Sequence, residues 1–253
     1  MIGHGSNLTA GRAGAAGFVV AAAAMVATPL LERGRRRLAS TAVVSGLAVT
    51  TGAAAVRRWG RPRALVAAAT IAVATTAIER LGTTTGRPFG RYHYSGALRP
   101  TAAGVPALVP AAWFAMSLPA REVAHAALGG RANPLTRIAL GAAALTAWDL
   151  FLDPQMVAEG YWRWDRPGRY RGIPLTNYAG WFATSLGLMA VLELLVPPRG
   201  RGDRALVGVY GWMAVMETVG FAAFFDDPLV AAVGGGAMVP LGAAGVRRVW
   251  TVG

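Results

Sequence analysis

The chain has 253 residues, of which 54% are hydrophobic and 15% are charged. This is too little polar surface to cover a soluble globule of that size, so the bilayer is the expected solvent. The formal net charge of +13 comes from arginines that gather in short clusters between apolar runs, which is typical of loops facing lipid headgroups and argues against nucleic-acid binding. Cysteine is absent, which excludes disulfides, thiolate metal sites and cysteine nucleophiles.

Eight apolar stretches have the length of about 17 to 25 residues that crosses a bilayer core. We interpret the first as a span rather than a signal peptide, because no cleavage site is separable from its Ala-rich run. The last is the weakest, because three consecutive glycines and Pro240 lower its helical preference, so a seven-span alternative stays open. The predicted spans are Ala13–Leu31, Leu38–Val56, Ala64–Leu81, Thr101–Ala120, Leu135–Leu152, Tyr178–Val196, Ala205–Phe225 and Leu229–Gly245.

These stretches predict an all-α fold, a polytopic transmembrane helical bundle that forms a single integral membrane domain over residues 1–253. We expect a multi-pass protein of the cell membrane. Small residues, mostly Ala and Gly, predict close packing between its helices. The arginines divide almost evenly between the two sides, so the positive-inside rule leaves the orientation open.

Two connections are longer and richer in polar and aromatic residues than the others. They run from Gly82 to Pro100 and from Asp153 to Asn177. In an eight-span arrangement, loops that follow odd-numbered spans emerge on the same side, so both loops share one side. The acids at the ends of the third, fifth and seventh spans share that side too: Glu79, Asp149, Asp153, Asp226 and Asp227.

Ionisable groups inside apolar spans are expensive and usually face a cavity, a partner or a reaction path. Four residues qualify: Glu79, Asp149, Glu193 and Glu217. For Glu193, close to a helix end, we expect an arginine partner or a depth shallow enough to reach water. For Glu122 we expect a local network with Arg121 and His125.

The segment WDLFLDPQ places Asp149 and Asp153 four residues apart, on one face of a helix that persists to Pro154. Two such carboxylates can share one proton near neutral pH, because burial and a neighbouring negative charge disfavour the second ionisation. A protonated carboxyl group is what proton addition to an unactivated alkene requires. The alternative is that Asp153 caps the helix or meets an arginine of the following loop.

Aromatic residues crowd the two loops and the helix ends beside them. They are Phe89, Tyr92, Tyr94, Trp148, Tyr161, Trp162, Trp164, Tyr170, Tyr178 and Trp181. Part of this set is expected to form an interfacial belt. Aromatic faces can also line a channel for a polyene and stabilise a transient cation. His93 lies among them, but a lone loop histidine is more often neither a metal ligand nor a proton shuttle.

Four segments carry a family resemblance: GRPFGRYHYS, GVPALVPAAWFAM, TAWDLFLDPQMVAEGYWRW and YRGIPLTNYAGW. Over roughly Glu79 to Trp181 the chain resembles the carotenoid biosynthesis membrane proteins of bacteria and archaea, which include carotenoid hydratases and bisanhydrobacterioruberin hydratases. The resemblance implies hydration of the terminal double bond of an acyclic carotenoid ψ-end to a tertiary alcohol. That reaction needs no redox cofactor, and we expect neither cofactor nor metal.

We hypothesise that Asp149 or Asp153 donates the proton, that the other positions water, and that Glu79 completes the catalytic set. The predicted substrate-binding residues are Tyr92, Tyr94, Trp148, Asn177, Trp181 and Glu217. The expected partners are membrane lipid, the carotenoid substrate and other enzymes of carotenoid biosynthesis.

Two other functions stay open. The first pair of aspartates, together with Asp226 and Asp227, resembles the Asp-rich motifs with which UbiA-like membrane prenyltransferases hold Mg²⁺ on a diphosphate. A non-catalytic carotenoid-binding or transport protein is the second alternative.

Overall fold

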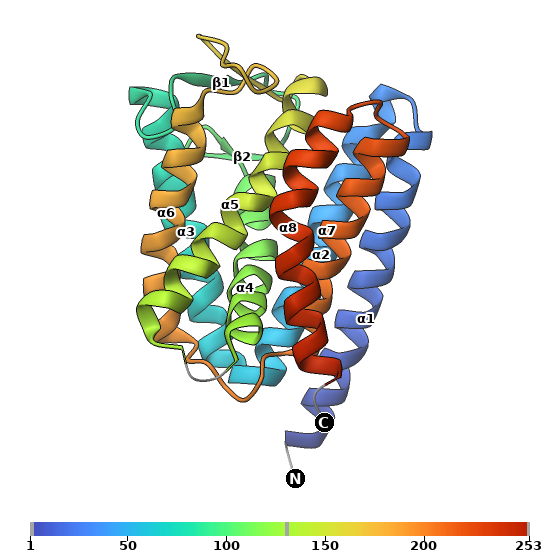
Figure 1. Cartoon of the computed structure of the whole chain (residues 1–253), viewed down its shortest axis with the longest axis vertical. Helices are drawn as coiled ribbons and strands as arrows, with labels where there is room; N and C mark the ends of the chain where they lie inside the picture. Colours follow the sequence, from blue (N-terminus) through green and yellow to red (C-terminus); the bar gives the residue numbers. More distant parts are fainter. Residues whose placement is uncertain (1–2, 130–131, 252–253) are drawn as a thin grey trace.

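In the computed structural model, residues 3–129 and 132–251 are described, and they form a bundle of long, roughly parallel and antiparallel helices (Figure 1). The helices are α1 Gly3–Ala27, η1 Thr28–Leu30, α2 Arg33–Trp59, α3 Arg61–Thr85, α4 Leu108–Leu128, α5 Pro134–Ala158, α6 Leu175–Leu195, α7 Arg204–Ala223 and α8 Pro228–Trp250. Short strands lie in the connections: β1 Tyr92–Tyr94, β2 Thr101–Ala102, β3 Val105–Pro106 and β4 Trp162–Trp164. The predicted all-α polytopic bundle is confirmed.

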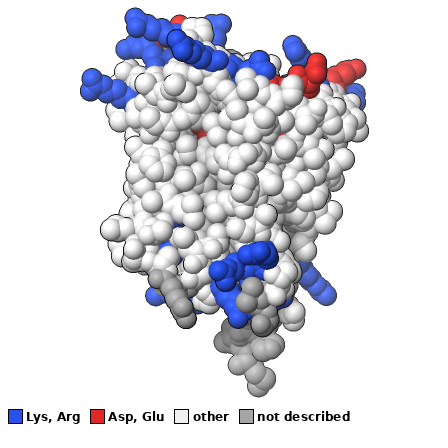
Figure 2. Space-filling view, viewed as in Figure 1, with Lys and Arg blue, Asp and Glu red and all other residues white. Residues whose placement is uncertain are grey.

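The surface is divided as a bilayer requires. Arginines gather at both ends of the molecule and acids at the upper end, and a broad band between the ends carries almost no charge (Figure 2). Seven of the described α-helices are long and apolar enough to cross a membrane by length and composition: α1, α2, α3, α5, α6, α7 and α8. The chain is therefore a multi-pass membrane protein.

The helix outside that set is α4, which lies at the centre of the bundle. It packs against α2, α3, α5, α7 and α8, and most of its side chains are buried. Arg121 and Glu122 on α4 are 4% and 0% exposed, so the other helices shield their charges from lipid. The prediction that the last span is the weakest was wrong, because α8 is apolar enough to span a membrane and α4 is not.

The predicted start of the fourth span was also wrong. Residues 101–106 form the β2–β3 hairpin, in which Thr101 pairs with Pro106 and Ala102 with Val105. Its two-residue turn, Ala103-Gly104, has positive φ at both positions, as hairpin turns of this length often require. The apolar composition hid the turn, and α4 begins only at Leu108.

Glycines let neighbouring helices touch through their backbones. A Cβ on Gly46 of α2 would lie 2.5 Å from the carbonyl oxygen of Gly17 on α1. A Cβ on Gly234 of α8 would lie 2.7 Å from the Phe151 ring on α5. These contacts confirm the predicted close packing, and they give Gly234 in the glycine-rich segment of α8 a packing role.

The two long loops meet at one end of the bundle, as predicted. Strands β1 and β4 pair antiparallel, with Tyr92 opposite Trp164 and Tyr94 opposite Trp162. The indole nitrogen of Trp164 also donates to the carbonyl oxygen of Phe89 at 3.1 Å. The paired loops cover the ends of α3, α5 and α6 (Figure 1), and the candidate site lies beneath them.

Candidate active site

Glu79 on α3 is buried beneath the paired loops and accepts three hydrogen bonds. The Tyr94 hydroxyl donates to Oε2 at 2.7 Å, the Tyr92 hydroxyl donates to the same oxygen, and the Trp113 indole donates to Oε1 at 3.2 Å. Gly82, one turn along α3, makes room for the rings of Phe89 and Tyr92, since a Cβ there would lie 2.8 Å from Phe89 and 3.1 Å from Tyr92. Three donors on one carboxyl group fit its ionised form, which can only accept.

The two phenols are held in their donating form. Burial, and next the neighbouring Glu79 carboxylate, raise the pKa of Tyr92 and of Tyr94 above the usual value for tyrosine. Both hydroxyls therefore stay protonated at neutral pH.

The second acidic group is the pair Asp149 and Asp153 on α5. The helix continues through Pro154 to Ala158, so both side chains lie on one face, as the spacing predicted. Pro154 has no N–H to give to the carbonyl of Leu150. That carbonyl instead accepts the Tyr170 hydroxyl at 2.9 Å, so the proline costs α5 no unsatisfied acceptor there.

One amide holds the two aspartates. Nδ2 of Asn177 on α6 donates to Oδ2 of Asp149 at 3.2 Å and also to Oδ2 of Asp153. The indole of Trp162 donates to Oδ1 of Asp153 at 3.2 Å, whereas Oδ1 of Asp149 has no partner among the described residues. The aspartates are 0% and 2% exposed. Asp153 neither caps α5 nor pairs with an arginine in the described chain, so that alternative was wrong.

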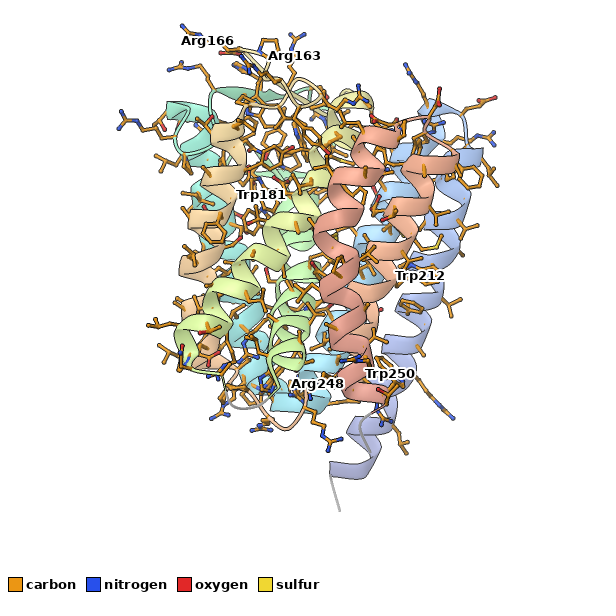
Figure 3. All side chains as sticks on the ribbon, viewed as in Figure 1. Arg163, Arg166, Trp181, Trp212, Arg248 and Trp250 are labelled. Carbon is orange, nitrogen blue, oxygen red and sulfur yellow. The ribbon has the colours of Figure 1, made fainter. Side chains whose placement is uncertain are left out.

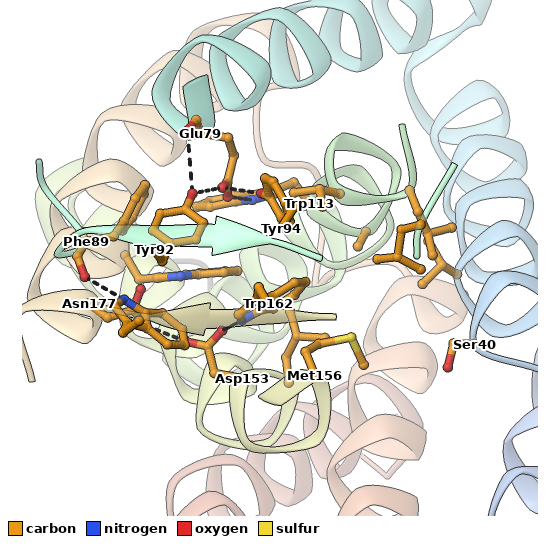
Figure 4. A pocket seen from close by; sticks show the side chains of 18 residues that line it. Ser40, Glu79, Phe89, Tyr92, Tyr94, Trp113, Asp153, Met156, Trp162 and Asn177 are labelled. Atoms are coloured by element: carbon orange, nitrogen blue, oxygen red, sulfur yellow. Dashed lines mark hydrogen bonds between the residues drawn. The ribbon is translucent and has the colours of Figure 1, made fainter. Parts of the chain in front are cut away.

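A cavity lies between the two acidic groups. Glu79 is on one side and Asp153 with Asn177 on the other, with β1 and β4 between them (Figure 4). Asp149 does not line the cavity and lies behind Asp153. Seven rings form much of the wall: Phe89, Tyr92, Tyr94, Trp113, Trp162, Trp164 and Trp181.

The rings pack against one another rather than around an open slot. Trp113 and Trp181 stack with centroids 4.2 Å apart and planes 10° apart. Tyr92 packs against Trp164 at 5.7 Å, and Tyr94 meets Trp162 edge-on at 5.9 Å. Trp181 lies below the loops, deep among the helices, whereas Arg163 and Arg166 extend above them (Figure 3).

Trp113 was missed by the sequence reasoning, although it lies in the quoted segment GVPALVPAAWFAM. Its indole contacts Glu79 and its ring faces Trp181, so it joins the acidic group to the aromatic wall.

The strand Trp162–Trp164 carried a signal in its alternation. Both tryptophans point inward and Arg163 points outward, and this alternation could have assigned Trp162 and Trp164 to the wall.

Two predicted substrate-binding residues do not lie at this cavity. Trp148 and Glu217 line a second cavity that adjoins the first, so their role as substrate-binding residues stays a prediction. The other predicted residues, Tyr92, Tyr94, Asn177 and Trp181, line the first cavity together with Glu79 and Asp153.

The second pair of aspartates serves the fold. Asp227 caps α8 by accepting the N–H of Val230 at 3.0 Å, and it pairs with Arg171 at 2.6 Å. Asp226 lies in the turn before α8 with a positive φ. Within the described residues, no group of three or more His, Cys, Asp or Glu side chains is arranged to hold a metal ion.

Glu193 and Glu122 have the arginine partners that we expected. Glu193 pairs with Arg121 at 3.3 Å and also with Arg137. Glu122 pairs with Arg121 at 2.7 Å and with Arg58 at 2.9 Å. His125 stays outside the predicted network and contacts a backbone carbonyl.

The comparison with known proteins assigns this arrangement to a family. A family model described as "Carotenoid biosynthesis protein" matches residues 37–246, from α2 almost to the end of α8. The chain belongs to the carotenoid biosynthesis protein family. The predicted family is thereby confirmed, and the match includes both acidic groups and both paired loops.

The chain is also similar to a protein that is named for its function. The bisanhydrobacterioruberin hydratase of Haloarcula japonica is 37% identical over 132 residues, which are 51% of this chain and 44% of the relative. The chain therefore matches less than half of that relative's length. No solved structure matches the chain.

Proposed function

We propose that this carotenoid biosynthesis protein is a carotenoid hydratase of the cell membrane. It adds water across the terminal double bond of an acyclic carotenoid end and forms a tertiary alcohol. The hydratase name of its relative supports the reaction type. The observation that carries the proposal is a buried pair of aspartates that meets an aromatic cavity, with a three-donor carboxylate on the opposite wall.

Asp153 is the proton donor in this proposal. It lines the cavity, whereas Asp149 lies behind it and is linked to it through Asn177. Two ionised carboxylates on one buried amide would repel each other, so the pair holds one proton. Asp153 transfers this proton to the less substituted alkene carbon, and the π electrons form the new C–H bond.

The cation that results is tertiary, and the cavity is suited to it. The stacked Trp113 and Trp181 offer ring faces, and aromatic faces attract a positive charge. Glu79 places a negative charge on the opposite wall, and its hydrogen bonds hold it in place. Charge that is fixed before the reaction stabilises the transition state without reorganisation.

Water completes the reaction by forming the C–O bond to the cation. The protonated alcohol then returns one proton to the Asp149–Asp153 pair, which restores the starting state. The net change is one alkene and one water to one alcohol, with no oxidant or reductant. Other carotenoid enzymes of the same membrane would supply the polyene and take up the alcohol.

The test is expression of the chain in a host that accumulates an acyclic carotenoid, followed by chromatography and mass analysis. We expect a product heavier by one water molecule. When the reaction runs in water labelled with heavy oxygen, that oxygen should appear in the new hydroxyl group. A pigment that co-purifies with unchanged mass would overturn the proposal in favour of a binding protein. A product that requires Mg²⁺ and a prenyl diphosphate would overturn it in favour of a prenyltransferase.

A further inference from the structure

A second cavity adjoins the first on the side of α1, α2 and α7. The two cavities share five lining residues: Ser40, Val44, Ala112, Leu152 and Met156. Ser40 and Met156 lie at the side of the first cavity that is remote from Phe89 and Asn177 (Figure 4). These shared residues make the two cavities neighbours, so the second is an adjoining space for the rest of a long molecule whose end reaches Asp153.

The lining of the second cavity is almost entirely apolar. It includes Met25, Val43, Met213 and Phe225 together with the ring of Trp148. Such a surface suits a hydrocarbon chain, and the second cavity adds room that a long polyene needs beyond the first one.

Glu217 on α7 is the one ionisable side chain in this lining, which also holds the polar Thr28, Ser40 and Gln155. Glu217 is 9% exposed, it lies in an apolar span, and no described residue donates to its carboxyl group or pairs with it. Glu79 and the Asp149–Asp153 pair, by contrast, have protein partners. A polar group without a partner in an apolar environment costs free energy that a ligand can recover by binding it.

The hydrogen-bonding capacity of Glu217 limits which chemical group of a ligand can bind it. A hydroxyl group both donates and accepts, so it satisfies a carboxyl group in either protonation state. A carbonyl group satisfies only the protonated form, and a hydrocarbon satisfies neither. Water could offer the same O–H chemistry, and the experiment below separates it from a hydroxyl carried on the chain.

We propose that the second cavity binds the part of an apolar isoprenoid chain that lies beyond the reacting double bond, and that Glu217 binds a hydroxyl group on that chain. The identity of the chain as an isoprenoid rests on the proposed function. Glu217 is thereby a specificity-determining residue that favours hydroxylated chains over plain hydrocarbons.

The test uses geraniol, farnesol and geranylgeraniol, which carry the same terminal double bond and place a hydroxyl group at increasing distances from it. Each alcohol and its parent hydrocarbon are partitioned between lipid nanodiscs with and without the protein and quantified by mass spectrometry. At one chain length we expect the protein to bind the alcohol about tenfold more tightly than its parent hydrocarbon, which is the effect of one buried hydrogen bond on affinity. Glu217→Leu should abolish this preference, and Glu217→Gln should retain most of it.

The matched control is Thr218→Val on the same helix, because the Thr218 hydroxyl donates to its own helix at Ala214. This variant should keep the preference. Equal binding of alcohol and hydrocarbon by the wild type at every length, which is the result expected if Glu217 holds water, would overturn the proposal. A preference that survives Glu217→Leu would do the same. If the protein hydrates a carotenoid but binds alcohol and hydrocarbon equally, only this inference is contradicted. If it prefers the alcohol but does not hydrate a carotenoid, only the proposed function is contradicted.

Discussion

Asn177 on α6 donates a hydrogen bond of 3.2 Å from Nδ2 to Oδ2 of Asp149 on α5. The same nitrogen also donates to Asp153, so two residues four apart on one helix are held by one amide from another. The two aspartates are nevertheless unequal, because Asp153 lines the cavity and Asp149 does not.

The first prediction follows from that inequality. Asp153→Asn should lower the hydration rate by about 10² to 10⁴, the usual worth of general acid catalysis. Asp149→Asn should lower it less, because the change spares the donor and removes only the group that shares its proton. Asp165→Asn is the control, since Asp165 is exposed and contacts His93. The rates are measured by chromatography of membranes given an acyclic carotenoid, and equal losses in both variants would contradict the assignment of Asp153.

Several features of this fold were accessible from the sequence for a physical reason. Bilayer thickness sets a span length, so the apolar stretches located the helices, apart from the fourth start. The period of a helix placed Asp149 and Asp153 on one face. Parity of the spans brought the two loops to one side, where β1 and β4 pair.

The rotation of each helix about its axis was not accessible. A helix that is apolar on all sides lacks the polar stripe that marks a buried face in a soluble protein. Glu217 therefore could not be assigned to the second cavity, nor Trp113 to the first. The central position of α4 follows from its charges only after the arginine and glutamate partners on other helices are known.

The second prediction concerns the three donors on Glu79. Glu79→Leu leaves two phenols and an indole without their acceptor, at about 1 to 3 kcal/mol for each buried group left unsatisfied. Glu79→Gln keeps an acceptor and should lose less stability. Thermal unfolding in detergent measures both. Equal unfolding temperatures for Glu79→Leu and the wild type would show that these hydrogen bonds do not hold the loops on α3.

The third prediction concerns the aromatic wall. Trp181→Leu removes one of two stacked ring faces and should lower the hydration rate about tenfold, whereas Trp181→Phe keeps a face and should lose much less. Trp212→Leu is the matched control, because Trp212 packs edge-on against Phe18 away from the first cavity. Leucine and phenylalanine variants with the same rate would mean that the ring at position 181 fills space and does not stabilise charge.

The last prediction separates stability from chemistry. Glu122 accepts from Arg121 at 2.7 Å, from Arg58 at 2.9 Å and from the N–H of Asp203 at 2.9 Å, near the end of α4 that lies away from the loops. Glu122→Gln removes the counter-charge of Arg58 and leaves the buried Arg121 with Glu193 alone, which costs about 3 to 5 kcal/mol. Unfolding should therefore occur at a lower temperature, while the rate per folded molecule stays unchanged.

The control for Glu122→Gln is Glu159→Gln, which breaks a single pair with the partly exposed Arg36 at the loop end of the bundle. A pair that reaches solvent is worth about 1 kcal/mol or less, so this variant should unfold near the wild-type temperature. If Glu122→Gln instead lowers the rate at constant stability, the charges around Arg121 act on the reaction across the whole bundle. The two acidic groups at the cavity would then not suffice to explain the chemistry.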